Sequence, residues 1–151
     1  MIPPRLIDYH MHTAVTIDAK MNEQEACARA VALGIQEIAF TNHVMLKQPD
    51  YIMSPEAFTA HWEQIQGCQR QFPQLKIRLG IEMDYLSGRG KEIASFLQDY
   101  EKMIGRPFDI VLGSIHDMKG NFFSKEVVDL LNNRCEAALI QTENEINAFQ
   151  V

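Results

Sequence analysis

The chain alternates short apolar segments with longer amphipathic segments, four times in succession. The short segments have the length of β-strands, and the longer ones follow the 3.6-residue period of an α-helix. Such alternation is typical of parallel strands joined by right-handed helical crossovers. We therefore predict an α/β fold. The expected strands are residues 6–12, 35–41, 76–82 and 108–115, and the expected helices are 22–33, 54–72, 89–104 and 124–149.

Local signals support several of these helix ends. Asn22 can cap the first helix, with Glu25 at the third position of a capping box. Ser54 followed by Pro55 is a typical start for the second helix, and Gly105 can end the third. These signals make the helix boundaries more specific than periodicity alone.

The number of βα units limits the architecture. An ordinary closed barrel takes about eight units and roughly 250 residues, whereas this chain has 151 residues and four units. The fold is expected to be either an open α/β sheet or part of a barrel. We interpret residues 1–151 as one domain, long enough to bury its own core.

Composition excludes several classes of partner. The net charge is −6 with no basic run, which opposes binding to a nucleic-acid backbone. No apolar run reaches the roughly 18 residues of a membrane span. The three cysteines, Cys27, Cys68 and Cys135, are far apart and form no C-x-x-C pair, so we interpret them as packing residues. A reduced, cytoplasmic setting is expected.

Metal-binding residue types occupy the ends of all four predicted strands, where ligands bind in parallel α/β folds. In the first strand, Asp8, His10 and His12 follow a two-residue period and are expected to share one face. The residues that end the other three strands are His43, Glu82 and His116.

Each of these residues has a simpler interpretation when taken singly. A lone H-x-H pair is weak evidence, and a single histidine after a strand is more often a surface or core residue. The joint placement at four successive strand ends favours a metal site instead. His61 is a contrast, because it lies mid-helix beside Trp62 and is interpreted as structural or solvent-exposed.

The same segments resemble the motifs of the PHP (polymerase and histidinol phosphatase) family, in its histidinol-phosphatase branch. Residues 8–13 (DYHMHT) resemble the first motif, H-x-H, and residues 40–43 (FTNH) resemble the second, commonly T-D-H. Residues 80–85 (GIEMDY) resemble the third, and residues 108–116 (FDIVLGSIH) resemble F-D-x-x-x-G-S-x-H. Four ordered motifs with family-like spacing make the resemblance specific.

This resemblance implies a fold and a set of cofactors. The fold would be a partial (β/α)7-type PHP barrel, left incomplete or completed by oligomerisation. The cofactors would be divalent zinc, manganese or iron, up to three ions in the family and fewer in this chain. Carried over by position, one ion would be held by His10, His12 and Glu82, a second by Glu82 and His116, and a third by Asp18 and His43.

The resemblance also implies a reaction, the hydrolysis of a small phosphate monoester such as histidinol phosphate by a metal-activated water. Imidazole and carboxylate ligands suit zinc, manganese or iron on chemical grounds alone, and such a reaction needs no side-chain nucleophile. The sequence contains no G-x-S-x-G motif or P-loop that would indicate a different mechanism.

The chain departs from the family pattern in three places. No histidine follows His116, Asp129 is followed by leucine instead of forming a D-x-H motif, and Asn42 replaces the usual acid of the second motif. The later His and the D-x-H motif account for three expected ligands, which are therefore missing together with the later strands that carry them. Three interpretations remain open: a truncated or split enzyme, a half-barrel closed by a second copy or a complementing chain, or a degenerate homologue.

The leading hypothesis is a metal-dependent phosphoesterase of histidinol-phosphatase type that acts on a small phosphorylated substrate. The main alternative is a degenerate or truncated PHP domain that binds metal or a partner without efficient catalysis. A polymerase-associated nuclease module is disfavoured by the acidic balance. An amidohydrolase is disfavoured because the later Lys or His pair and the final Asp of that class are missing.

Overall fold

The computed structural model describes residues 5–86, 88–115, 117–118 and 121–122. The expected helix over residues 124–149 lies outside the described part. The strands are β1 (Ile7–Met11), β2 (Glu37–Phe40), β3 (His43–Val44), β4 (Lys76–Asp84), β5 (Ile110–Ser114), β6 (Asp117–Met118) and β7 (Asn121–Phe122). The helices are α1 (Glu23–Ala32), the short 3-10 helix η1 (Pro49–Tyr51), α2 (Pro55–Gln71) and α3 (Gly90–Ile104).

The main sheet is parallel, and its strands lie side by side in chain order. β1 pairs with β2, while β2 and β3 pair in turn with the same edge of β4. β5 pairs with the other edge of β4, and β6 and β7 form a separate antiparallel pair. The second predicted strand, residues 35–41, therefore corresponds to β2, and β3 continues its line along β4 after a two-residue break.

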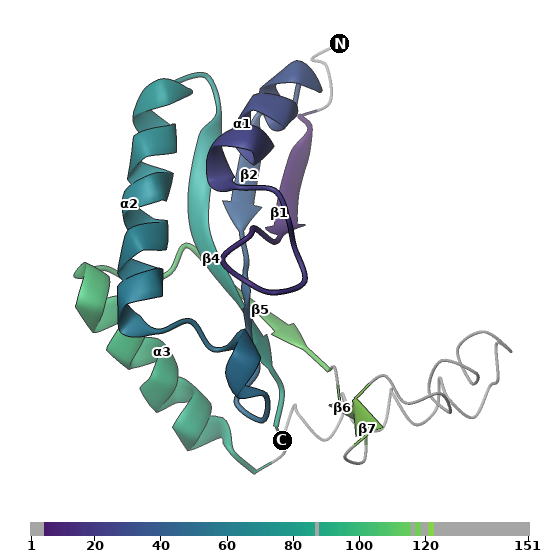
Figure 1. Ribbon diagram of the computed structural model, residues 1–151, viewed down its shortest axis with the longest axis vertical. Helices are drawn as coiled ribbons and strands as arrows, with labels where there is room; N and C mark the ends of the chain where they lie inside the picture. The colour runs from purple at the N-terminus through teal and green to yellow at the C-terminus, as the bar shows by residue number, and fades with distance from the viewer. Residues whose placement is uncertain (1–4, 87, 116, 119–120, 123–151) are drawn as a thin grey trace, which may run out of the picture.

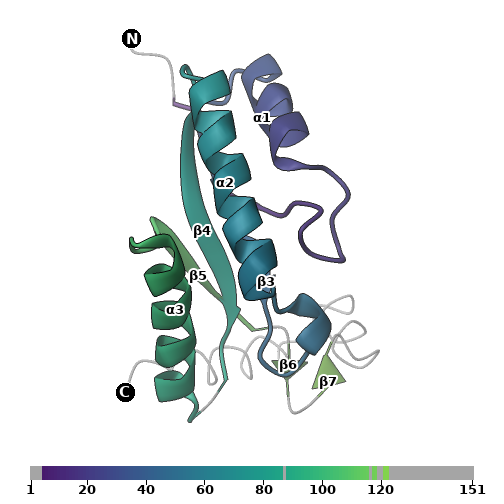
Figure 2. The same cartoon turned by 60° about the vertical axis from the view of Figure 1, so that its left-hand side comes forward.

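The three α-helices cover one face of this sheet, as Figure 1 shows, and the view in Figure 2 separates α2 and α3 from β4 behind them. Alternate residues of β4, Ile77, Leu79, Ile81 and Met83, join the buried core between sheet and helices. Chain-order strands with helices on one face form a half-barrel, which confirms the predicted partial barrel. Among the described residues, no helix combines the length and apolar character that crossing a membrane requires.

The predicted helix ends are confirmed by hydrogen bonds and backbone angles. The Asn22 side chain accepts from the Glu25 backbone N–H at 2.9 Å, and the Glu25 side chain accepts from the Asn22 backbone N–H at 3.1 Å. Ser54 caps α2 by accepting from the backbone N–H of Ala57. Gly105 ends α3 with φ 70°, a left-handed conformation that glycine adopts without strain.

The sheet face opposite the helices is polar at its amino end. Glu37 is 2% exposed and lies 2.8 Å from Nε of Arg78 and 3.4 Å from Nζ of Lys76, and Arg5 also contacts it. The hydrogen bond from Arg78 holds the pKa of Glu37 at about 2. The carboxylate is therefore buried as an ion, with several cations offsetting its lost hydration.

Gly80 allows the central strand to approach its neighbours closely. A Cβ atom at this position would lie 2.7 Å from Cγ2 of Thr41, and 3.1 Å from the backbone oxygens of Phe40 and Ile110. Two of these three neighbours are backbone atoms, which cannot rotate away. A side chain at this position would therefore push β4 away from β2 and β5.

We predict that Gly80→Ala lowers the free energy of unfolding by about 1–3 kcal/mol, because the added methyl overpacks a site bounded by backbone. Urea denaturation of the purified chain measures this change. Gly67→Ala, within α2, is the matched control, since apart from its chain neighbours and the backbone of α2 no atom lies within 4 Å of the added Cβ. It should stabilise by roughly 0.5–1 kcal/mol through helix propensity. An unchanged urea midpoint for Gly80→Ala would contradict the prediction.

Candidate metal centre

The carboxyl ends of the parallel strands bring one buried carboxylate and three imidazoles together. Oε2 of Glu82 lies 3.0 Å from Nε2 of His10 and 2.9 Å from Nε2 of His12. The same oxygen lies 3.0 Å from Nδ1 of His43. His10, His12 and Glu82 each offer an atom within 4.8 Å of the others, so they form a group that could hold a metal ion.

Asp18, in the loop between β1 and α1, supplies a second carboxylate. Its Oδ2 lies 2.9 Å from Nδ1 of His12 and 3.3 Å from Nε2 of His43. His12 and His43 therefore each present both ring nitrogens to carboxylate oxygens, and their ring centroids are 4.0 Å apart. His12, Asp18 and His43 form a second group that could hold a metal ion.

This donor set fits a bound cation better than a set of hydrogen bonds. A neutral imidazole carries a single N–H, so His12 and His43 could each donate to only one of the two carboxylates. The remaining nitrogen and oxygen atoms would face each other with lone pairs unless a proton or a metal ion lay between them. Imidazole and carboxylate together suit zinc, manganese or iron.

The two carboxylates also favour positive charge at this position. The hydrogen bond to Glu82 raises the pKa of His12, and Asp18 adds to the shift although burial opposes it. Burial raises the pKa of Asp18, but hydrogen bonds from His12 and Thr16 outweigh it and leave that pKa below its usual value. Both shifts have the sign expected of a site that stabilises a cation.

An irregularity in β1 places His10, within the strand, and His12, directly after it. Asp8 pairs with Ile38 and Met11 with Phe40, so three steps along β1 match two steps along β2. Ile38 and Phe40 both belong to the core, and Asp8 therefore lies beside a core-facing residue. The expectation that Asp8 shares a face with the histidines is wrong, because this β-bulge breaks the alternation. Instead, Oδ1 of Asp8 accepts from the backbone N–H of His10.

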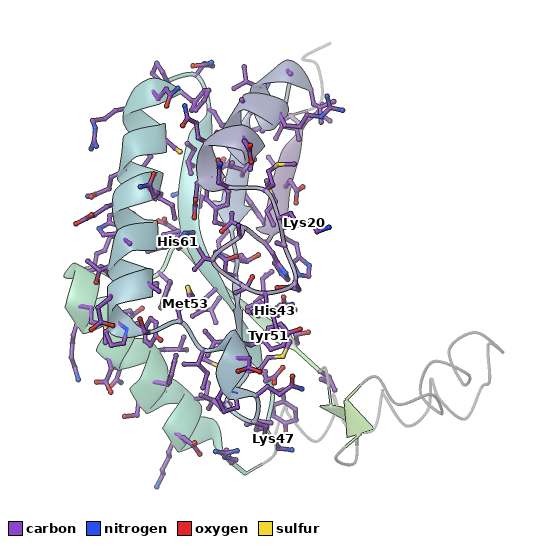
Figure 3. All side chains as sticks on the ribbon, viewed as in Figure 1. Lys20, His43, Lys47, Tyr51, Met53 and His61 are labelled. Atoms are coloured by element: carbon purple, nitrogen blue, oxygen red, sulfur yellow. The ribbon has the colours of Figure 1, made fainter. Side chains whose placement is uncertain are left out.

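The break between β2 and β3 places His43. In the parallel register His43 lies beside Glu82, and both project toward the site. Within the break, the Thr41 hydroxyl accepts from the backbone N–H of Met11 at 3.2 Å, which connects the break to the irregular end of β1. Tyr51 of η1 meets the His43 ring edge to face at 5.6 Å, and Figure 3 shows the two side chains next to each other.

The structure thus brings five predicted site residues together: His10, His12, Asp18, His43 and Glu82. The sixth, His116, lies outside the described residues. Sequence reasoning did not single out Tyr51, for which no local signal exists. It also passed over Asp84, which is buried two residues beyond Glu82 on the same strand and could have been found from the two-residue period.

Comparison with known proteins finds histidinol-phosphatases among the proteins to which this chain is similar. A curated histidinol-phosphatase from Lactococcus lactis subsp. lactis (strain IL1403) is 30% identical over 116 residues, covering 74% of this chain and 39% of that protein. The solved histidinol phosphate phosphatase of the same strain, complexed with zinc, L-histidinol and phosphate, has a TM-score of 0.66 at 27% identity. That match covers 77% of this chain and 42% of the solved one.

A structure from Listeria monocytogenes shares the fold, with a TM-score of 0.66 at 21% identity over 80% of this chain and 50% of that chain. A sequence profile of the PHP domain matches residues 8–149. The chain belongs to the PHP domain family. It spans 39% and 42% of the lengths of two curated relatives.

Proposed function

We propose that this chain binds divalent metal ions and takes part in the hydrolysis of a small phosphate monoester of the histidinol phosphate type. The observation that carries the proposal is the convergence of His10, His12 and His43 on Oε2 of Glu82. Neutral imidazoles cannot satisfy all of these nitrogen and oxygen atoms by hydrogen bonds, whereas a bound cation can. The zinc, L-histidinol and phosphate bound by the Lactococcus relative support the chemical class.

Each residue has a proposed role in this site. His10, His12 and Glu82 hold one ion, and Asp18 with His43 contributes to another. His116 remains a proposed ligand by position in the sequence. A bound divalent cation neutralises phosphoryl oxygens and lowers the pKa of water. Glu82 keeps the imidazole nitrogens directed at one point, and its burial limits competition from solvent.

The proposed native ion is zinc, supported by the zinc-bound relative and by the nitrogen and oxygen donors. Manganese and iron accept the same donors and are alternatives for the metal test. A domain that binds metal without turnover is the second candidate function. Asn42, which replaces the acid usual in the second motif, favours it.

We further propose that a second copy or a complementing chain closes the half-barrel. Within the described sheet, β1 pairs only with β2 and β5 only with β4, so each has one edge without a strand partner there. Leu6 and Ile7 beside one edge are 49% and 51% exposed, and Val111 on the other is 48% exposed. Edge strands with apolar residues favour pairing with another chain.

The metal assignment predicts that purified wild-type chain retains zinc and that His12→Ala loses most of it. His12 belongs to both candidate groups, so its removal takes a donor from each. Added zinc at 100 times its Kd should stabilise the wild type by about 2.7 kcal/mol, and His12→Ala much less. Asp99→Asn, on the exposed surface of α3, is the control and should behave as wild type. Equal metal content in wild type and His12→Ala would count against the site.

The phosphatase assignment predicts metal-dependent release of phosphate from histidinol phosphate and from p-nitrophenyl phosphate. Zinc and manganese are added separately to the metal-free chain, and phosphate is measured over time. Glu82→Gln should abolish turnover, because its neutral amide cannot replace the charge that gathers the imidazoles. A wild type that binds metal but releases no phosphate would instead establish the non-catalytic alternative.

Completion of the barrel by a second copy predicts a mass above that of one 17.3 kDa chain. Light scattering coupled to size-exclusion chromatography measures this mass at several protein concentrations. Ile7→Lys should weaken pairing at β1, since a charge on an edge strand opposes strand addition. A wild type that elutes as a stable monomer throughout would exclude a homo-oligomer.

A further inference from the structure

A closed ring of hydrogen bonds lies between the candidate metal centre and the helices. Its four members are Glu23, the first residue of α1; His61, in the middle of α2; Asn42, between β2 and β3; and Thr13, directly after His12. The exposed fractions are 6%, 2%, 1% and 0% respectively. Figure 3 shows His61 between α2 and the sheet. Four buried polar side chains from separate elements thus meet at one point.

The distances around the ring are those of ordinary hydrogen bonds. Nδ1 of His61 lies 2.6 Å from Oε1 of Glu23, and Nε2 of His61 lies 3.2 Å from Nδ2 of Asn42. Asn42 Nδ2 donates to Oγ1 of Thr13 at 3.1 Å, and that hydroxyl is 3.2 Å from Oε1 of Glu23. Each side chain therefore contacts two others, and the ring closes.

The direction of every proton follows from one backbone group. The N–H of Thr13 can only donate, and it lies 2.7 Å from Oδ1 of Asn42, which fixes the orientation of that amide. Nδ2 of Asn42 must then donate to Nε2 of His61, so Nε2 carries no proton. The proton of the imidazole is on Nδ1 and is donated to Glu23. The Thr13 hydroxyl, which accepts from Asn42, donates its own proton to Glu23.

Glu23 anchors the ring as a buried anion. Burial raises the pKa of its carboxyl, but the hydrogen bond from His61 and others outweigh this and leave the pKa below its usual value. The carboxylate accepts the two hydrogen bonds that the ring directs toward it, from His61 and from Thr13. A satisfied network of this kind rigidifies the segments that carry it.

Two members of the ring are chain neighbours of candidate ligands. Thr13 follows His12 directly, and Asn42 precedes His43 directly. The bond between Thr13 N–H and Asn42 Oδ1 therefore joins the two backbone segments that carry these rings. His12 and His43 share both Asp18 and Glu82, so their separation decides whether one donor set can form.

We propose that Glu23, His61, Asn42 and Thr13 are positioning residues that set the separation of His12 and His43 for metal binding. The inference rests on the proposed function, because it assumes that those two histidines are ligands. His61 acts through Asn42, and Asn42 acts through the Thr13 backbone. None of the four needs to contact the metal.

The test compares variants on α2 by cobalt(II) binding to the full chain. His61→Phe removes both ring contacts and should weaken cobalt affinity about 10- to 100-fold, as removal of groups that orient ligands typically does. It should also change the visible absorption spectrum of bound cobalt, which reports ligand geometry. His61→Gln should recover most of the affinity, because its terminal amide can accept from Asn42.

A control separates positioning from general destabilisation. Ile65→Val removes one methyl from a fully buried residue of the same helix and should lower stability in urea. Its cobalt affinity and spectrum should match those of the wild type. If His61→Phe fails to fold, Thr13→Val removes only a hydroxyl from the ring and should show the same loss of affinity.

The outcomes distinguish this inference from the proposed function. A wild type that binds no cobalt overturns the metal site and the positioning role together. A wild type that binds cobalt, with variants of His61 and Thr13 that bind it equally well and give the same spectrum, overturns only the positioning role. Weaker binding and a changed spectrum in His61→Phe, with a normal spectrum in Ile65→Val, establish it.

Discussion

A carboxylate buried at the end of the central strand needs protons or cations around it, because its lost hydration is otherwise too costly. Glu82 is 2% exposed and draws His10, His12 and His43 around one of its oxygen atoms. The bulge in β1 and the break between β2 and β3 are the backbone adjustments that let these rings reach it. The bulge and the break thus both serve to surround the buried carboxylate of Glu82 with imidazole nitrogens.

Two of the buried carboxylates on the polar face of the sheet, Glu37 and Glu82, have different surroundings. Glu37, at the amino end, is contacted by Arg5 and Arg78 and by Lys76 at a longer distance. Arginine is charged at every relevant pH and has no lone pair to offer. The side chains around Glu37 therefore supply no nitrogen ligand for a metal ion. The imidazoles around Glu82 keep ring nitrogens that can bind a metal. Residue type, more than burial, therefore separates a structural ion pair from a candidate metal centre.

The unusual Asn42 has a physical explanation in the ring behind the centre. An amide can accept from the Thr13 backbone and donate to Nε2 of His61 at the same time, which a carboxylate cannot do. With an acid at this position, His61 would need a second proton. The asparagine therefore matches a neutral imidazole whose single proton is directed at Glu23.

Periodicity, helix caps and metal-type residues at strand ends were readable in the sequence, because each acts over a few residues. They predicted the parallel strands, the first three helices, the ends at Asn22 and Gly105, and five candidate ligands that meet in the structure. The pairing register in β1, the division of the second strand and the burial of His61 beside Glu23 were decided only in the folded chain. His61 and Glu23 are 38 residues apart, and contact between such distant side chains depends on how α1 and α2 pack on the sheet, which no local pattern records.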